Sequence, residues 1–182
     1  MKEDLNSGSS LYFKPKDGEN RIRVVTEPVK IWKSFNKATK TAKVYVTEKG
    51  AKTDQEAKPR FLMHVLNRDA GNQLQIAEFG SQVMSQFLDL ATSSEYGFAS
   101  VESLTYDFIL MKKGAGMETE YTLQGSRRES PLTSEEREIA RQAKPIMEML
   151  KEDKAVVDLG GELKTEDIPF YHDHHRSFRP NG

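Results

Sequence analysis

The sequence predicts a mainly β protein: a small closed barrel of five strands, with a helix between the third and fourth strands and a second helix near the C-terminus. Short alternating runs rich in β-branched residues recur over residues 21–79 and 104–123, and Gly and Asn turn signals separate them. One segment, 81–92, instead has apolar residues at helical spacing. A barrel is the expected form because closure removes the unpaired edges of short strands.

The first strand is predicted over residues 21–25. Polar and apolar residues alternate along it, and alternate side chains of a strand point to opposite faces. This pattern places Ile22 and Val24 toward the core. We therefore expect Arg21 and Arg23 to face solvent.

Two further strands are predicted on either side of a lysine-rich turn. Pro28 interrupts the chain, so residues 29–35 form a second strand or a bent continuation of the first. Residues 43–47 alternate again. Lys43 and Tyr45 then share the face opposite the two valines of that strand, which favours an exposed tyrosine ring.

A hairpin is predicted next. Residues 50–58 are polar and have no periodicity, which is typical of a loop. The apolar run 60–66 indicates a central strand, and 74–79 is its partner across a turn at 69–72. His64 lies within the apolar run, so we interpret it as a hydrogen-bonded core histidine.

The pattern then changes to a helix and returns to strands. Residues 81–92 form an amphipathic helix with its apolar positions on one face. Strands follow at 104–111 and 118–123, joined by a basic, glycine-containing turn at 112–116. Tyr106 and Tyr121 share the parity of apolar neighbours and are expected in the core, whereas Phe61 cannot be assigned.

A C-terminal helix is predicted from a capping box. Thr133 and Glu136 have the spacing in which each side chain bonds the other's backbone N–H. The helix runs to about Lys151, and Pro145 kinks or divides it. A small β-barrel with a helix between its third and fourth strands is the arrangement of an OB-fold, and the C-terminal helix is added to it. The expected organisation is a flexible arm (1–10), an OB-fold domain (11–127), a C-terminal helix (128–153) and a polar tail (154–182).

Composition limits the class of protein. The 182 residues contain no cysteine, so disulfides, thiolate catalysis and cysteine-based metal sites are excluded. No secretory leader and no apolar run long enough to span a bilayer is visible, so we expect a cytoplasmic protein, in the host cytoplasm if it is viral, with no membrane partner. The net charge of -1 conceals an asymmetry: residues 1–68 carry +7 and residues 69–182 carry -8. Such a chain can present one basic surface.

The segment from Pro28 to Lys52 carries the main functional signal. It holds seven lysines against one acid, Glu48, and three aromatic residues lie among them. Ammonium groups attract phosphates and flat rings stack on unpaired bases. This combination favours a surface for single-stranded nucleic acid.

Four features of the chain occur together: residues 13–25 (Phe-Lys-Pro-Lys-Asp-Gly-Glu-Asn-Arg-Ile-Arg-Val-Val), the Arg60-Phe61 strand entry, the helix after Phe79, and the Tyr121 strand leading to residues 131–133. They carry a resemblance to the OB-fold single-stranded DNA-binding (helix-destabilising) proteins of tailed bacteriophages. It covers roughly residues 11–150. It implies binding of single-stranded DNA during replication, recombination or repair of phage DNA.

The chain departs from that family at two places. Many members carry a Cys/His zinc module near the region that matches residues 35–60, and this segment has no cysteine, so no zinc site is carried over. The family often ends in an acidic tail that binds partners. Here lysines dilute the acids after Glu152, although Glu166 to Phe170 is similar to the acidic, Phe-ended tip of bacterial single-stranded DNA-binding proteins. That region is the expected contact for replication or recombination proteins.

The candidate nucleic-acid-binding residues are cationic or aromatic and lie on the early strands and on the 112–116 turn. They are Arg21, Arg23, Lys30, Trp32, Lys33, Phe35, Lys37, Lys43, Tyr45, Arg60, Arg68, Lys112 and Lys113. Two alternatives stay open from the sequence: Trp32 stacks on a base or closes the barrel end, and the arginines pair with phosphate or with neighbouring acids such as Glu19 or Asp69.

No catalytic motif is present. The sequence has no nucleophile elbow, no HExxH motif and no Walker loop, so we expect neither an enzyme nor a cofactor. The histidines at 172–175 are interpreted as a tail without a specific metal site. The leading hypothesis is a non-catalytic protein that binds single-stranded DNA without strong sequence preference. The alternatives are a β-barrel adaptor or virion component, and an RNA-binding OB module.

Overall fold

The computed structural model describes residues 11–153 and 155–158, which belong to two compact units. Unit 1 comprises residues 11–29 and 61–144, and unit 2 comprises residues 30–60 with the described part of the chain after Lys144. Strand residues outnumber helical ones, so the prediction of a mainly β protein is confirmed. The predicted arm (1–10) and nearly all of the predicted tail lie outside the described residues.

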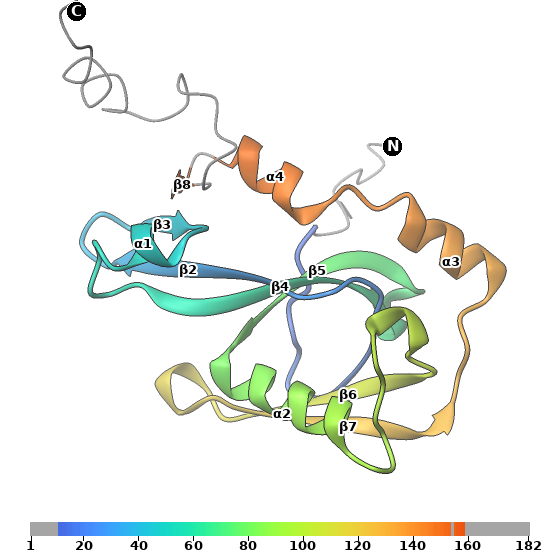
Figure 1. The fold of residues 1–182 in the computed structure, drawn as a ribbon. Helices are drawn as coiled ribbons and strands as arrows, with labels where there is room; N and C mark the ends of the chain where they lie inside the picture. The colour runs from blue at the N-terminus through green and yellow to red at the C-terminus, as the bar shows by residue number, and fades with distance from the viewer. Residues whose placement is uncertain (1–10, 154, 159–182) are drawn as a thin grey trace, which may run out of the picture. The chain divides into compact units, whose positions relative to one another are not determined.

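Unit 1 is built on an open sheet (Figure 1). Its strands follow the order β7–β6–β1–β4, and β5 pairs with β4. The pairings of β1 with β4, β1 with β6 and β6 with β7 are antiparallel. The strand bounds are β1 (Gly18–Val24), β4 (Lys58–Asn67, in this unit from Phe61), β5 (Gln73–Gly80), β6 (Tyr106–Lys113) and β7 (Glu120–Glu129).

The core of unit 1 forms between this sheet and α2 (Ser81–Thr92), the helix predicted over the same residues. Ile22 pairs with Phe108 across β1 and β6, and both are fully buried. The ring of Phe87, from α2, lies 5.4 Å from that of Phe108. Burying one such side chain contributes about 1.5–3 kcal/mol. Tyr106 is buried as predicted, whereas Tyr121 and Phe61 are partly buried against the same core.

Gln86, on α2, binds the backbone of β7. Its amide nitrogen donates to the carbonyl of Tyr121 at 3.2 Å, and its amide oxygen accepts from the N–H of Leu123 at 2.7 Å. A peptide group of a neighbouring strand would make the same two bonds. One side chain therefore satisfies two backbone hydrogen-bonding groups of β7, the strand at the end of the sheet.

Short helices and turns complete unit 1. They are η1 (Arg68–Ala70), η2 (Val101–Ser103), η3 (Gly116–Glu118) and α3 (Ser134–Arg141). The predicted capping box is present, because Thr133 and Glu136 each accept from the other's backbone N–H, at 3.1 Å in both directions. Gly114 has a φ of +81° and packs against the carbonyl of Glu118, so this turn requires glycine.

Unit 2 centres on a β-hairpin. It contains β2 (Val29–Asn36, in this unit from Lys30), β3 (Thr41–Tyr45), α1 (Glu48–Ala51), α4 (Ile146–Glu152) and β8 (Val156–Asp158). β2 and β3 are antiparallel, and β8 adds to β3 in parallel. α1 was not predicted, and its last two residues fall within the segment 50–58 that was predicted as a loop. The predicted C-terminal helix is divided at Pro145 into α3 and α4, one of the two outcomes expected for a proline there.

Candidate nucleic-acid interface

The β2–β3 hairpin sorts its side chains onto two faces. Trp32 pairs with Tyr45 and Ser34 pairs with Lys43. Residues directly opposite each other in an antiparallel pair point to the same face, so these four lie together. Lys30 joins them, because its ammonium lies 4.9 Å from the centroid of the Trp32 ring. We call this side of the hairpin the lysine face.

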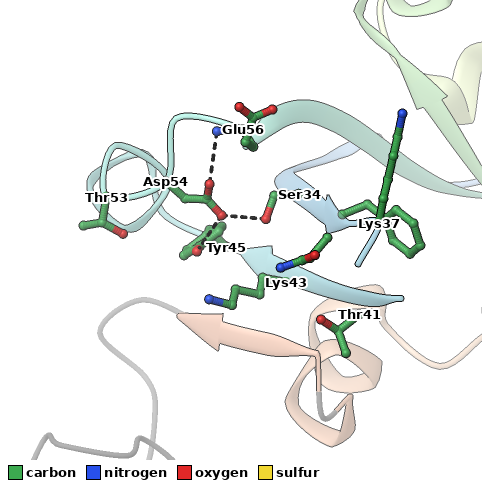
Figure 2. Close-up of a pocket in the computed structure, with 10 residues that line it drawn as sticks. Ser34, Lys37, Thr41, Lys43, Tyr45, Thr53, Asp54 and Glu56 are labelled. Carbon is green, nitrogen blue, oxygen red and sulfur yellow. Dashed lines mark hydrogen bonds between the residues drawn. The ribbon is translucent and has the colours of Figure 1, made fainter. Parts of the chain in front are cut away.

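The lysine face opens into a pocket of about 540 Å³ (Figure 2). The segment after α1 supplies Asp54 and Glu56 to its wall. Asp54 is fixed by three donors: the hydroxyl of Ser34 at 2.5 Å, the hydroxyl of Tyr45 at 3.0 Å and the backbone N–H of Glu56 at 3.0 Å. The carboxylate of Asp54 thus has one orientation.

These bonds set the ionisation of both partners. The hydrogen bond from Ser34 lowers the pKa of Asp54, and the bond from Tyr45 and the charge of Lys43 lower it further, against the effect of burial. Burial raises the pKa of Tyr45, and the neighbouring Asp54 raises it further. At neutral pH the carboxylate is ionised and the phenol keeps its proton, as the donor and acceptor roles require.

The structure corrects the prediction that the Tyr45 ring is exposed. Tyr45 is buried, with 6% of its surface exposed, so its ring does not offer a free face, contrary to the alternation argument. The ring lies on the face that alternation predicts, but the segment around Asp54 packs over its hydroxyl, so the expected exposure is wrong. Phe35 is 59% exposed and lines the pocket. Trp32 is half-buried and Lys30 occupies one side of its ring.

The predicted lysines of unit 2 differ in exposure. Lys30, Lys37 and Lys43 are exposed, and the last two line the pocket. Lys33 is half-buried, on the hairpin face that also carries the buried Val44. Arg60 is half-buried, and its guanidinium donates to the carbonyl of Pro59 at 3.4 Å.

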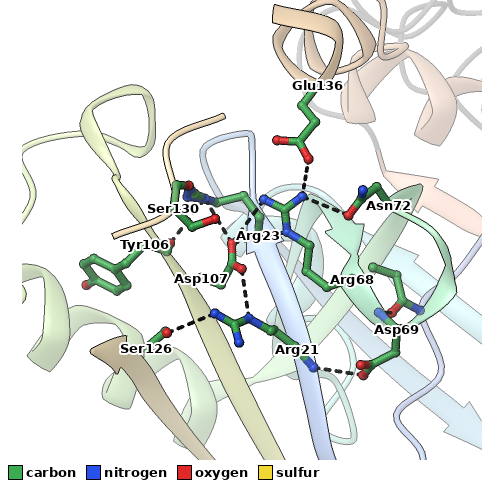
Figure 3. Close-up of polar contacts among 11 residues, drawn as sticks. Arg21, Arg23, Arg68, Asp69, Asn72, Tyr106, Asp107, Ser126, Ser130 and Glu136 are labelled. Carbon is green, nitrogen blue, oxygen red and sulfur yellow. Dashed lines mark hydrogen bonds and ion pairs between the residues drawn. The ribbon is translucent and has the colours of Figure 1, made fainter. Parts of the chain in front are cut away.

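The predicted arginines of unit 1 surround one buried carboxylate, that of Asp107 (Figure 3). Arg21 donates to it from Nε at 3.0 Å, and Arg68 donates from Nη2 at 3.2 Å. The Nε of Arg23 lies 3.6 Å from it. We call this set of three arginines and Asp107, with Glu136, the arginine cluster.

Arg23 corrects a second sequence prediction. It was expected to face solvent, but it is fully buried, and its Nε donates to the carbonyl of Tyr106 at 3.2 Å. Its Nη2 also donates to the carbonyl of Ser130. Alternation correctly places Arg21 and Arg23 on one side of β1, since both reach Asp107. The error lies in the assumption that this side is exposed. Burial lowers the pKa of Arg23, while Asp107 partly opposes this effect.

Glu136 connects α3 to the arginine cluster. Its carboxylate accepts from Nη1 of Arg68 and also closes the capping box with Thr133. Burial alone would raise the pKa of Glu136, but the bonds from Arg68 and Thr133 outweigh this and lower it. Arg68 is likewise held charged, because Glu136 and Asp107 raise its pKa against the effect of burial. Arg23 and Arg68 therefore serve the fold of unit 1, and Arg21 retains partial exposure.

The last two predicted cations lie at the hairpin between β6 and β7. Lys112 forms an ion pair with Asp17 at 3.3 Å, and Lys113 is exposed. Of the thirteen predicted residues, seven thus lie on the β2–β3 hairpin of unit 2, Arg60 lies on β4 in the same unit, and five form two groups in unit 1.

Sequence reasoning missed the acids that organise these cations. Asp107 lies inside an otherwise apolar strand beside Phe108, and a charged residue in such a run signals a buried ionic partner. The sequence predicted the role of Glu136 in the helix cap but not its contact with Arg68. Asp54 lies in a polar loop, and no local pattern distinguishes it there.

The described residues contain no group of three or more His, Cys, Asp or Glu side chains placed to hold a metal ion. The histidines at 172–175 lie outside them. Across residues 11–153 and 155–158, the helices are too short or too polar to cross a bilayer. No protein-family model, curated protein or solved structure matches the chain.

Proposed function

We propose that this chain binds single-stranded DNA without strong sequence preference and protects it during phage replication, recombination or repair. The proposed interface is the exposed part of the β2–β3 hairpin: the lysine face together with Phe35 and Lys37 near the turn, both of which line the pocket. The observation that carries the proposal is the presence, on one short hairpin, of three exposed lysines and an exposed phenyl ring: Lys30, Lys37, Lys43 and Phe35.

Charge supports an interface with phosphates. Residues 30–60 contain nine Lys or Arg and three Asp or Glu, a net charge of +6 in a chain whose total is -1. A cationic surface of this kind concentrates a polyanion and speeds its encounter. The exposed ring of Phe35 favours single strands over duplex, because stacking requires a base that is already unpaired.

The proposal also covers the type of β fold and the protein partners of the chain. The strands would belong to an OB-type barrel of the partly open kind, which is compatible with the open sheet and whose strands and connecting loops bind oligonucleotides in other proteins. The acidic second half of the chain, at -8 over residues 69–182, would recruit replication or recombination proteins.

A salt titration tests the interface. The full chain is titrated against a fluorescein-labelled oligonucleotide by anisotropy at several salt concentrations. The logarithm of the affinity should fall linearly with the logarithm of salt, with a slope of about -0.7 for each phosphate contacted. Removing two contacts with Lys37→Ala and Lys43→Ala should reduce the slope by about 1.4. Lys14→Ala, at an exposed lysine of unit 1, is the control and should change the slope by less.

Competitors separate the alternatives. Unlabelled single-stranded DNA should displace the probe, and duplex of the same length should not. Equal displacement by RNA would favour the RNA-binding reading. Binding that ignores salt, or that is absent altogether, would exclude the proposal and leave the adaptor reading.

A further inference from the structure

The pocket on the lysine face is balanced in charge. Its wall contains two ammonium groups, from Lys37 and Lys43, and two carboxylates, from Asp54 and Glu56. A bare phosphate would meet repulsion from the carboxylates, and a bare cation would meet repulsion from the lysines. The composition fits a ligand that carries an anionic group at one end and hydrogen-bond donors at the other.

Asp54 presents a defined acceptor to such a ligand. An ionised carboxylate offers about four acceptor sites on its two oxygens. The hydroxyls of Ser34 and Tyr45 both donate to Oδ2, and the N–H of Glu56 donates to Oδ1. One site on Oδ1 therefore remains. Because three donors fix the carboxylate, a ligand donor that reaches it does not have to order the side chain first.

A nucleotide has this distribution of groups. Its phosphate is anionic, its base has a flat face, and cytosine and adenine carry exocyclic amino groups that donate. Carboxylate side chains accept from the N4 amino group of cytosine in established base readout. The pocket's volume of about 540 Å³ lies within the range of roughly 300–1,000 Å³ seen for small-ligand sites.

We infer that the pocket holds one base of the bound strand and prefers a base with an exocyclic amino group, with the amino group on Asp54 or Glu56 and the flanking phosphates on Lys37 and Lys43. This inference rests on the proposed function and adds a modest base preference to it. Among pyrimidines, cytosine is favoured. Uracil and thymine present a carbonyl oxygen at the same position, which a carboxylate repels.

The test compares deoxycytidine and deoxyuridine homo-oligonucleotides of one length, by anisotropy with the full chain at mildly alkaline pH. The two bases stack similarly and differ in two groups of one edge: cytosine has an amino group at C4 and an unprotonated N3, whereas uracil has a carbonyl oxygen at C4 and an N3–H. One additional hydrogen bond predicts about fivefold tighter binding of the cytosine strand. Glu56→Gln, at an exposed side chain, and Asp54→Asn should each bring the ratio of the two affinities toward one. Glu48→Gln, at an exposed side chain on α1 of the same unit, should leave the ratio unchanged.

The outcomes separate the inference from the proposed function. Equal affinity of the wild-type chain for both strands, or a cytosine preference that survives both pocket substitutions, would overturn the base pocket and leave single-strand binding intact. Failure to bind either strand would overturn both. Loss of the cytosine preference in Glu56→Gln, with an unchanged melting temperature, would support the base pocket even if the Asp54→Asn protein does not fold.

Discussion

Replacing Asp107 with asparagine should strongly destabilise unit 1. The side chain is 3% exposed and three arginines surround it, with nitrogen–oxygen distances of 3.0, 3.2 and 3.6 Å. Asparagine keeps nearly the same shape but removes the charge. The guanidinium of Arg23, 1% exposed, would then remain buried without its nearest carboxylate.

The expected magnitude follows from that burial. Removing one partner of a buried ion pair costs about 3–5 kcal/mol, because the other charge stays desolvated. Asparagine keeps an acceptor oxygen, so we expect about 3 kcal/mol, the lower end. A typical domain has about 5–15 kcal/mol of stability, so the variant should remain folded with a clearly lowered melting temperature.

Urea unfolding followed by circular dichroism measures this loss. Glu138→Gln is the matched control, since its carboxylate pairs with Arg141 at 2.9 Å on the exposed surface and should cost less than about 0.5 kcal/mol. Adding Arg23→Met to Asp107→Asn should recover part of the loss, because it removes the guanidinium that the first substitution leaves buried without a carboxylate. An Asp107→Asn protein within about 1 kcal/mol of wild type would refute the account of the arginine cluster.

Three further predictions concern the ring, the core histidine and a close contact. Phe35→Ala should weaken single-strand binding by about 5- to 150-fold, the value of one stacked base, with little change in melting temperature; Leu88→Ala, 52% exposed on α2, should change neither. Burial lowers the pKa of His64 below its ordinary 6.5. As pH falls, the imidazole is therefore protonated in the unfolded chain before it is protonated in the folded one, so the free energy of unfolding should fall below about pH 6.5. His64→Gln should remove this loss of stability; an equal loss in wild type and variant would contradict the explanation. Gly125→Ala places a methyl 2.7 Å from the Tyr96 ring and should cost about 1–3 kcal/mol in urea unfolding; an unchanged midpoint would mean the ring moves freely.

Local signals in the sequence predicted most of the elements. The apolar spacing at 81–92 predicted α2 with its observed bounds, and the Thr133–Glu136 spacing predicted the cap that is present. Pro145 marked the point where the helix divides. These features depend on residues within a few positions of one another, so a sequence pattern contains the relevant information.

The environment of side chains depended on contacts distant in sequence. Alternation placed Arg23 on the correct side of β1, but burial of that side comes from Asp107, 84 positions later, and from the chain at Ser130. Tyr45 likewise follows the expected face, and Asp54 then covers its hydroxyl. β8 was missed because three residues in a polar segment carry too little pattern to indicate a strand. The exposed residues of the lysine face were easier to predict, because charged side chains seldom enter a core unpaired.

The contact between Gln86 and β7 affects whether another molecule can pair with this edge of the sheet. A terminal strand with free N–H and C=O groups is a template on which another molecule can extend the sheet. Because one amide side chain satisfies the groups of Tyr121 and Leu123, an incoming strand would first have to displace it. We therefore expect Gln86 to oppose the addition of a strand from another molecule at the β7 edge.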